Sequence, residues 1–396
     1  MNFELSSEQK SIRERAAEFA DSEVAPGAAA LDLEDRVPHE TLGRMAELGF
    51  MGLCVPEEYG GGGTDFLSYV LMLEEVSRAD AGVGVTVAVH TSAGTLPILE
   101  YGSAGQKARW VPDLARGTAL ACFALTEREA GSDAAAIAAR AEPVEGGYRI
   151  TGSKQWITNG RAASTMTVFA RAPGGVTAFI VPMSAAGVSF GHHARKMGVI
   201  SATTDDVLLD SVFVPVEDRI GEEGSGLKVA FGTLDGGRIG VAAQALGIGE
   251  AAFRYAARYA SERTTFGKPL AGHQAIAFKL AEMQTELEAA RLSVYHAAWL
   301  KDAGRRHTEA GARAKLLASQ TANRVVDAAV QVLGGRGYMK DESPLERLYR
   351  DARVTEIYEG ASEIQKIVIS RGILKELEGK FQSTESLPDA LPKEVN

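Results

Sequence analysis

The chain is poor in the residues that build disulfide-linked, metal-dependent and nucleic-acid-binding proteins. Cys54 and Cys122 are the only cysteines in 396 residues, too few for a disulfide framework and not at the spacing of metal ligands. The 42 lysines and arginines are outnumbered by 52 aspartates and glutamates. The net charge of -10 argues against a nucleic-acid partner, because no basic excess exists to neutralise phosphates. A Walker A loop and an HExxH motif are also missing.

Two further absences concern the cell compartment. No stretch approaches the length of an apolar membrane span, and the acidic N-terminus has no signal-peptide pattern. We therefore expect a cytoplasmic protein whose two cysteines are buried, reduced side chains. The composition is that of an ordinary globular protein, with 45% hydrophobic and 24% charged residues and enough chain for two or three domains.

Hydrophobic periodicity predicts an α+β fold in three domains. Residues 1–121 have helical periodicity and are expected to form an all-α domain. Residues 122–226 contain short β-branched runs and a Pro173-Gly174-Gly175 hairpin signal, which predict an antiparallel β-barrel or sandwich. Residues 227–380 are expected to form a four-helix bundle, and residues 381–396 a disordered tail. The predicted helices cover residues 6–20, 38–48, 66–78, 93–100, 104–115, 227–260, 271–303, 308–334 and 362–378.

The strongest catalytic candidate is a carboxylate followed directly by glycine, Glu359-Gly360. Ser362, expected as a helix N-cap, and an amphipathic run come after it. Glu359 is therefore expected on a tight connection before a helix, which can aim a side chain into a cleft. Burial there would raise its pKa and suit it to act as a general base. A solvated loop glutamate is the simpler local alternative.

Two stretches at the start of the predicted sheet could line a flat ligand. Residues 124–133 supply Thr, Ser, Gly and backbone N–H groups, although a polar interdomain loop has the same composition. Within residues 154–160, Trp156 offers an aromatic face and Thr158 a hydroxyl. A core tryptophan before an Asn-Gly turn is the alternative for this second stretch.

Three stretches of the predicted bundle could bind phosphate groups. Asp235 and Arg238 are one helical turn apart, which suits either a ligand or an ordinary ion pair. Arg263 lies on an interhelix loop and could hold a pyrophosphate. Residues 331–338 are glycine-rich, which allows close approach of a dinucleotide but is also typical of a helix end.

In this order and spacing, the stretches closely resemble the acyl-CoA dehydrogenase family, and the resemblance covers the chain to about residue 377. Short-chain, butyryl-CoA-type members look most similar, through residues 234–240 and 244–248. The resemblance implies a homotetramer, built as a dimer of dimers, of subunits with helical, β and helical domains. Its most specific pieces are Thr126-Glu127, Gly131-Ser132-Asp133, Trp156-Ile157-Thr158-Asn159-Gly160, Arg263-Thr264-Thr265-Phe266-Gly267, Gly334-Gly335-Arg336-Gly337-Tyr338 and Ile357-Tyr358-Glu359-Gly360.

The resemblance also implies a reaction and the residues that serve it. Glu359 would abstract the α-proton of an acyl-CoA thioester, whose oxygen its own N–H would hold, while the β-hydrogen leaves as hydride to flavin N5. Electrons would then pass to an electron-transfer flavoprotein. The implied acyl-CoA-binding residues are Ser132, Asp235, Arg238 and Gly360. The implied FAD-binding residues are Phe123, Leu125, Thr126, Gly131, Ser132, Trp156, Ile157, Thr158, Arg263, Phe266, Gln274, Gln331, Val332, Leu333, Gly334, Gly335, Ala361, Ser362 and Glu363, and those from Arg263 to Gly335 would act across a subunit interface.

Two positions bear on the substrate. Gly237 stands where isovaleryl-CoA and long-chain members carry their catalytic carboxylate, so that placement is excluded here. If Gln244 faces the acyl tunnel, as the short-chain resemblance suggests, its bulk favours short or medium straight chains. A branched-chain dehydrogenase, an oxidase-like activity and a catalytically silent binding protein remain as alternatives. Departures from the family pattern are Ala361 for Thr, Arg128 for Pro, and a missing Arg near Ile200.

Overall fold

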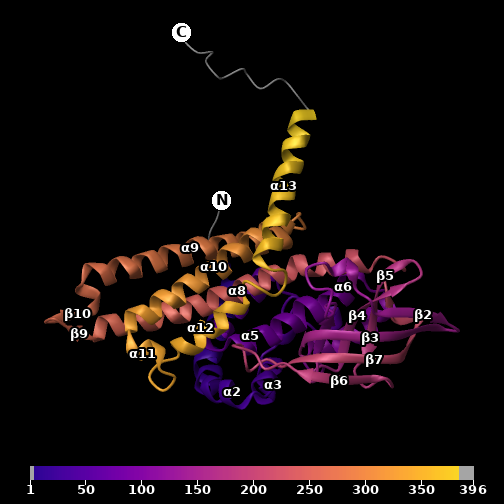
Figure 1. The fold of residues 1–396 in the computed structure, drawn as a ribbon, viewed down its shortest axis with the longest axis horizontal. Helices are drawn as coiled ribbons and strands as arrows, with labels where there is room; N and C mark the ends of the chain where they lie inside the picture. The colour runs from indigo at the N-terminus through magenta and orange to yellow at the C-terminus, as the bar shows by residue number, and fades with distance from the viewer. Residues whose placement is uncertain (1–3, 383–396) are drawn as a thin grey trace, which may run out of the picture.

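The computed structural model describes residues 4–382, without the side chains of residues 378–382. It has N-terminal helices, a middle sheet and long C-terminal helices, in that order along the chain (Figure 1). The predicted fold class is confirmed. The domain boundaries stay predictions, and the predicted disordered tail lies outside the described residues from residue 383 onward.

The N-terminal helices begin at side chains that cap them. The Ser6 hydroxyl accepts the N–H of Gln9, and the backbone N–H of Ser6 donates to Oε1 of Gln9, a capping box that starts α1. Asp65 caps α4 through the N–H of Ser68. The helices are α1 (Ser7–Phe19), α2 (Ala28–Glu34), α3 (His39–Glu47), α4 (Phe66–Ala79), α5 (Ala81–Ala88), α6 (Leu96–Tyr101) and α7 (Ala104–Ala115).

One element that the periodicity did not predict is α5. All eight of its residues are buried, so no polar face alternates with an apolar one. Asp80 caps it by accepting the N–H groups of Gly82 and Val83 at 2.8 and 2.9 Å. A π-helical segment, Val89–Thr95, continues it into α6, so the helix predicted from residue 93 begins earlier.

This continuous stretch corrects another expectation. By length and composition, Ala81–Tyr101 is long and apolar enough to cross a membrane. The prediction that no stretch approaches that length was therefore wrong. The apolar window of this stretch is 94% buried inside the protein. The core helix of a soluble protein can have the same length and composition, so this finding is weak evidence for a membrane span.

The middle part is one mixed sheet. Its strand order is β6-β7-β3-β2-β4-β5-β8, with β1 beside β4. The predicted hairpin is confirmed, because β4 and β5 pair antiparallel and Ala172 faces Gly175. The sheet is not purely antiparallel, since both β1 and β2 run parallel to β4. The strands are β1 (Ala121–Ala124), β2 (Arg140–Val144), β3 (Gly147–Thr158), β4 (Thr165–Ala172), β5 (Gly175–Pro182), β6 (Val188–His193), β7 (Thr204–Pro215) and β8 (Arg219–Ile220).

The C-terminal part is built on the longest helix, α8, which packs against both α10 and the N-terminal α4. One hydrophobic core therefore joins the two helical parts. Short α11 and α12 were not predicted; α13 starts on α10 and then projects from the body (Figure 1). The elements are α8 (Gly226–Glu262), β9 (Thr264–Thr265), β10 (Lys268–Pro269), α9 (Gln274–Asp302), α10 (Thr308–Leu333), α11 (Gly335–Tyr338), α12 (Leu345–Val354) and α13 (Ser362–Gln382).

Candidate active site

A cavity lies where the three parts of the chain meet. Its walls come from α5 and the π-helical segment, from β1 and the loop after it, from the end of β3, and from α8. The cavity has a volume of about 200 Å³, and its lining of mostly apolar side chains with a few polar groups is typical of a small-molecule site. The predicted site residues that line it are Phe123, Leu125, Thr126, Gly131, Ser132, Trp156, Ile157, Thr158, Arg238, Glu359 and Gly360.

Glu359 enters this cavity from a strained turn between α12 and α13. Its φ is 52° and that of Gly360 is 86°, so both residues are left-handed. A non-glycine residue held in this region costs roughly 1–3 kcal/mol and is common at functional sites. The predicted tight connection is therefore confirmed. Ser362 is already the first residue of α13, so it is not the expected N-cap.

Three hydrogen bonds hold the turn from outside the cavity. The Gly360 carbonyl accepts Nζ of Lys315 at 2.8 Å and Nε2 of Gln365 at 2.7 Å. The same Gln365 amide reaches the Glu359 carbonyl at 3.3 Å. The peptide planes on both sides of Gly360 are thus fixed by side chains of α10 and α13.

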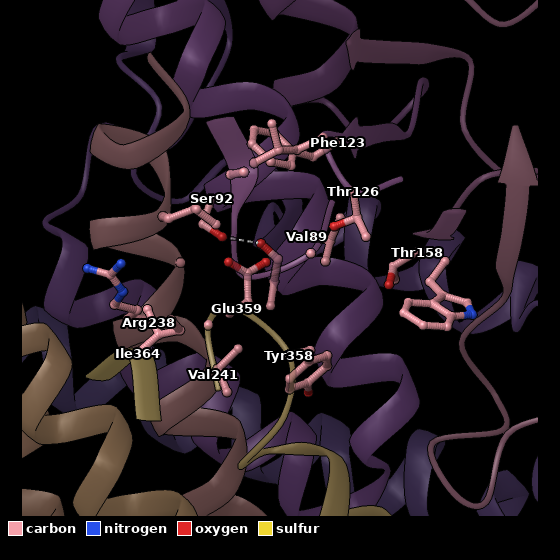
Figure 2. Close-up of a pocket in the computed structure, with 18 of the residues that line it drawn as sticks. Val89, Ser92, Phe123, Thr126, Thr158, Arg238, Val241, Tyr358, Glu359 and Ile364 are labelled. Atoms are coloured by element: carbon pink, nitrogen blue, oxygen red, sulfur yellow. Dashed lines mark hydrogen bonds between the residues drawn. The ribbon is translucent and has the colours of Figure 1, made fainter. Parts of the chain in front are cut away.

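The carboxyl group of Glu359 projects into the cavity. Figure 2 shows it at the centre of the cavity, with Arg238 on one side and Thr126 and Thr158 on the other. Its Oε2 atom is buried and has no hydrogen-bond partner among the described residues. Burial raises the pKa of Glu359, while the positive charges of Arg238 and Lys315 act in the opposite direction.

Gly237 makes room for this carboxylate. A Cβ atom on Gly237 would stand 2.9 Å from Oε2 of Glu359, closer than side-chain carbons normally come. The glycine lies inside α8, where it weakens the helix. A side chain at this position would therefore displace the tip of the Glu359 carboxylate.

The wall beside β3 presents an aromatic face to the cavity. The pairing of β3 with β7 slips between Lys154 and Ile157, and Trp156 has a φ of 58°. This irregularity turns Trp156 out of the sheet, so that it is 60% exposed. The alternative of a core tryptophan is therefore wrong. An exposed indole beside the hydroxyls of Thr126 and Thr158 fits the flat ring of a flavin.

A buried ion pair, which the sequence analysis missed, supports the loop after β1. Lys154 is fully buried and donates to Oε1 of Glu127 at 2.6 Å and to the Leu125 carbonyl at 3.1 Å. Glu127 also accepts the N–H groups of Ala138 and Ala139. The alternation of β3 could have signalled this pair, because Lys154 is in phase with the buried Tyr148 and Ile150.

Asp235 and Arg238 separate into two roles. They form the ion pair that was the simpler alternative. Arg238 also lines the cavity, and its buried Nε has no partner among the described residues. Asp235 does not line the cavity and instead accepts the Thr308 hydroxyl at 2.6 Å. Its predicted contact with substrate stays a prediction.

Another group of predicted residues lies away from the cavity. In Figure 1, β9, β10 and α11 lie toward the same end of the long C-terminal helices. Phe266 is 96% exposed there. The predicted residues that do not line the cavity are Asp235, Arg263, Phe266, Gln274, Gln331, Val332, Leu333, Gly334, Gly335, Ala361, Ser362 and Glu363. The residues from Arg263 to Gly335 were expected to bind FAD of another subunit, and this contact stays a prediction.

Several lining residues were not predicted. Val85, Ala88, Val89 and Ser92 form one wall, from α5 and the π-helical segment that follows it. Their apolar run contains no residue type that signals a site. Tyr358 also lines the cavity, and its hydroxyl donates to the buried side chain of Gln244. Gln244 itself lies behind Tyr358 and does not line the cavity, so the expectation that its side chain faces the acyl tunnel is not confirmed.

Comparison with known proteins gives a consistent result over almost the whole chain. Residues 6–118, 122–212 and 224–374 match the family models of the N-terminal, middle and C-terminal domains of acyl-CoA dehydrogenase. An acyl-CoA dehydrogenase of Bacillus subtilis (strain 168) is 45% identical over 375 residues, which are 93% of this chain and 99% of that protein.

Two solved structures extend the match to three dimensions. Butyryl-CoA dehydrogenase from Megasphaera elsdenii superposes with a TM-score of 0.93 at 41% identity, covering 94% of this chain and 100% of its own. A glutaryl-CoA dehydrogenase from Mycobacterium smegmatis, solved in complex with FADH2, has a TM-score of 0.89 at 31% identity, with 95% of this chain and 96% of its own covered.

Proposed function

The chain belongs to the acyl-CoA dehydrogenase family, and we propose that it converts acyl-CoA thioesters into trans-2-enoyl-CoA with Glu359 as the base. It is a flavin-dependent oxidoreductase, and FAD is its cofactor. The observation that carries the assignment of the base is the carboxyl oxygen of Glu359 in the cavity, which is buried and has no hydrogen-bond partner within residues 4–382. Bound FAD supplies the acceptor for the β-hydrogen.

The residues of this chain perform the proton transfer and the positioning. Burial raises the pKa of Glu359, so the ionised carboxylate is a stronger base than an exposed one. The positive charges of Arg238 and Lys315 act against this rise in the pKa and favour the ionised form of the carboxylate. Trp156, Thr126 and Thr158 form the wall that would hold the flavin ring, and the Lys154–Glu127 pair keeps this wall rigid.

The left-handed turn also serves the substrate. An acyl thioester becomes acidic at its α-carbon only if the charge that develops on its oxygen is stabilised. We assign this task to the backbone N–H of Glu359, because the turn is fixed by Lys315 and Gln365 before substrate arrives. Ser132, Arg238 and Gly360 are the proposed substrate contacts that line the cavity.

The substrate we propose is a short straight-chain ester. Tyr358 lines the cavity and Gln244 holds its hydroxyl, while Gln244 donates to the Ala81 carbonyl at 2.8 Å. This pair anchors a bulky ring in the wall, which shortens the space for an acyl chain. Each excluded methylene group forgoes about 0.8 kcal/mol of burial. The similarity to butyryl-CoA dehydrogenase supports the same preference.

The proposal also covers the electron acceptor, the assembly and the location of the protein. We propose an electron-transfer flavoprotein as electron acceptor, a homotetramer as the assembly and the cytoplasm as the location. The exposed Phe266 and the apolar side chains on the projecting α13, which include Ile373 and Leu374, support an assembly of several subunits.

Replacement of the base tests the proposed function. Glu359→Gln keeps the size of the side chain and should leave a folded, yellow protein. The rate of anaerobic flavin bleaching by butyryl-CoA should fall by at least the ~10²–10⁴-fold typical of a general base. A variant that bleaches at nearly the normal rate would remove Glu359 from this role. A wild-type protein that binds acyl-CoA without any bleaching would instead favour the catalytically silent alternative.

A further inference from the structure

The interior of the C-terminal helices contains a lysine that the proposed reaction does not yet use. Lys315 belongs to α10 and is fully buried. A buried lysine without a task is costly, because the desolvation of an ammonium group must be offset by partners. Its side chain donates a hydrogen bond from Nζ to the carbonyl of Gly360, at 2.8 Å.

The position of this bond is specific. Gly360 is the second left-handed residue of the turn that carries Glu359, with a φ of 86°. Its carbonyl accepts from two donors, Lys315 and Gln365, which come from different helices. A turn that is strained by itself keeps one conformation only when its surroundings determine it. Lys315 is therefore placed where it can determine the geometry of the base.

We propose that Lys315 is a positioning residue of the dehydrogenation reaction, which holds the Glu359-Gly360 turn through the Gly360 carbonyl and supplies a fixed positive charge behind Glu359. The inference rests on the proposed function of Glu359 and deepens it. Lys315 has no place in the cavity lining, so it acts through Glu359 and not on the substrate.

The charged groups around Lys315 and Glu359 agree with this role. Burial lowers the pKa of Lys315 to about 8, and the negative charge of Glu359 acts in the opposite direction, so the ammonium form prevails at neutral pH. The other groups that face Lys315 are Arg238 on α8, Glu356 before the turn and Glu363 on α13. Arg238 also faces Glu359, as do the buried hydroxyls of Tyr69 and Tyr358.

The two parts of the proposal predict different results. Loss of the charge should raise the pKa of Glu359, because one of the two cations that favour its ionised form is gone. Since the base must be ionised to take a proton, the ascending limb of the pH–rate profile should move to higher pH. Loss of a hydrogen bond alone should slow the reaction at every pH without moving the limb.

The experiment compares Lys315→Met, Lys315→Arg and Gln365→Leu as complete, FAD-loaded proteins. Single-turnover bleaching of the flavin by saturating butyryl-CoA is measured against pH. In Lys315→Met we expect the ascending limb of the pH–rate profile to lie about one pH unit higher, because a neighbouring charge shifts a carboxyl pKa by at least about one unit. The bleaching rate at neutral pH should be about tenfold to a hundredfold lower. In Lys315→Arg the limb should return towards the wild-type position. In Gln365→Leu the rate should fall with the limb unmoved.

Lys196→Met is the matched control. Lys196 likewise donates to a backbone carbonyl, that of Ala202 at 2.7 Å, and burial likewise lowers its pKa. It does not line the cavity, and neither its bond nor its charged neighbours include Glu359. Its profile should match that of the wild type.

The outcomes separate this inference from the proposed function. A Lys315→Met protein with the wild-type limb and a rate within twofold would overturn the role of Lys315, provided that Glu359→Gln has lost bleaching. If Glu359→Gln bleaches normally, the function itself fails. Should Lys315→Met not retain FAD, Lys315→Gln keeps a donor without the charge, and an unmoved limb in that variant would equally refute the proposal.

Discussion

The contact between Gly237 and Glu359 yields the sharpest prediction about catalysis. In Gly237→Ala the new Cβ would lie 2.9 Å from Oε2 of Glu359, whereas ordinary contact begins at about 3.4 Å. The carboxylate tip must therefore retreat by about 0.5 Å. Since a misplacement of about 1 Å can cost ~10²-fold in rate, we expect flavin bleaching by butyryl-CoA to slow about tenfold, or ~1.4 kcal/mol in activation free energy.

The same substitution should leave the fold intact. Its collision is with the flexible end of a side chain, and alanine in a helix interior gains roughly 0.5–1 kcal/mol over glycine. Gly236→Ala is the matched control, because its Cβ would meet only the end of the Lys301 side chain, Nζ at 3.7 Å and Cε at 3.8 Å, which are ordinary contacts. Equal bleaching rates in the two variants would refute the reasoning. So would a loss of bound FAD in Gly237→Ala alone.

Two further predictions concern assembly and substrate. Arg263→Ala should purify partly colourless and as a weakened oligomer if Arg263 reaches FAD of a neighbouring subunit, because cofactor binding and association are then linked. The flavin-to-protein absorbance ratio measures FAD binding, and sedimentation velocity measures association. A wild-type protein that is fully flavinated and stable as a monomer would contradict this prediction. The ratio kcat/KM should peak near butyryl-CoA and fall towards palmitoyl-CoA, since this ratio reports discrimination between competing substrates. A maximum at long chains or at isovaleryl-CoA would show that the argument from Tyr358, Gln244 and Gly237 is wrong.

Local signals in the sequence determined many of the elements. The capping box at Ser6 starts α1, and the Pro173-Gly174 turn joins β4 to β5. The long helices predicted over residues 227–260, 271–303 and 308–334 are present as α8, α9 and α10. The order of the motifs around Thr126, Trp156 and Glu359 was enough to indicate the family.

Tertiary structure alone decided what periodicity cannot encode. The helix α5 is buried on all sides, so it carries no alternation by which to recognise it. The parallel partners of β4 come from distant parts of the chain, and only the folded sheet selects them. Trp156 could be read as core or as surface until the slip in the β3–β7 pairing turned it outward.

The same division holds at the active site. The sequence by itself determined that a carboxylate precedes a glycine and a helix at residue 359, because these are neighbours in the chain. It did not determine that Oε2 is buried and unpartnered, that Gly237 faces it, or that Lys315 reaches the turn. These features arise from residues up to 122 positions apart, between Gly237 and Glu359. Burial and electrostatics depend on which distant side chains meet, and only the packing of α8, α10 and α13 brings them together.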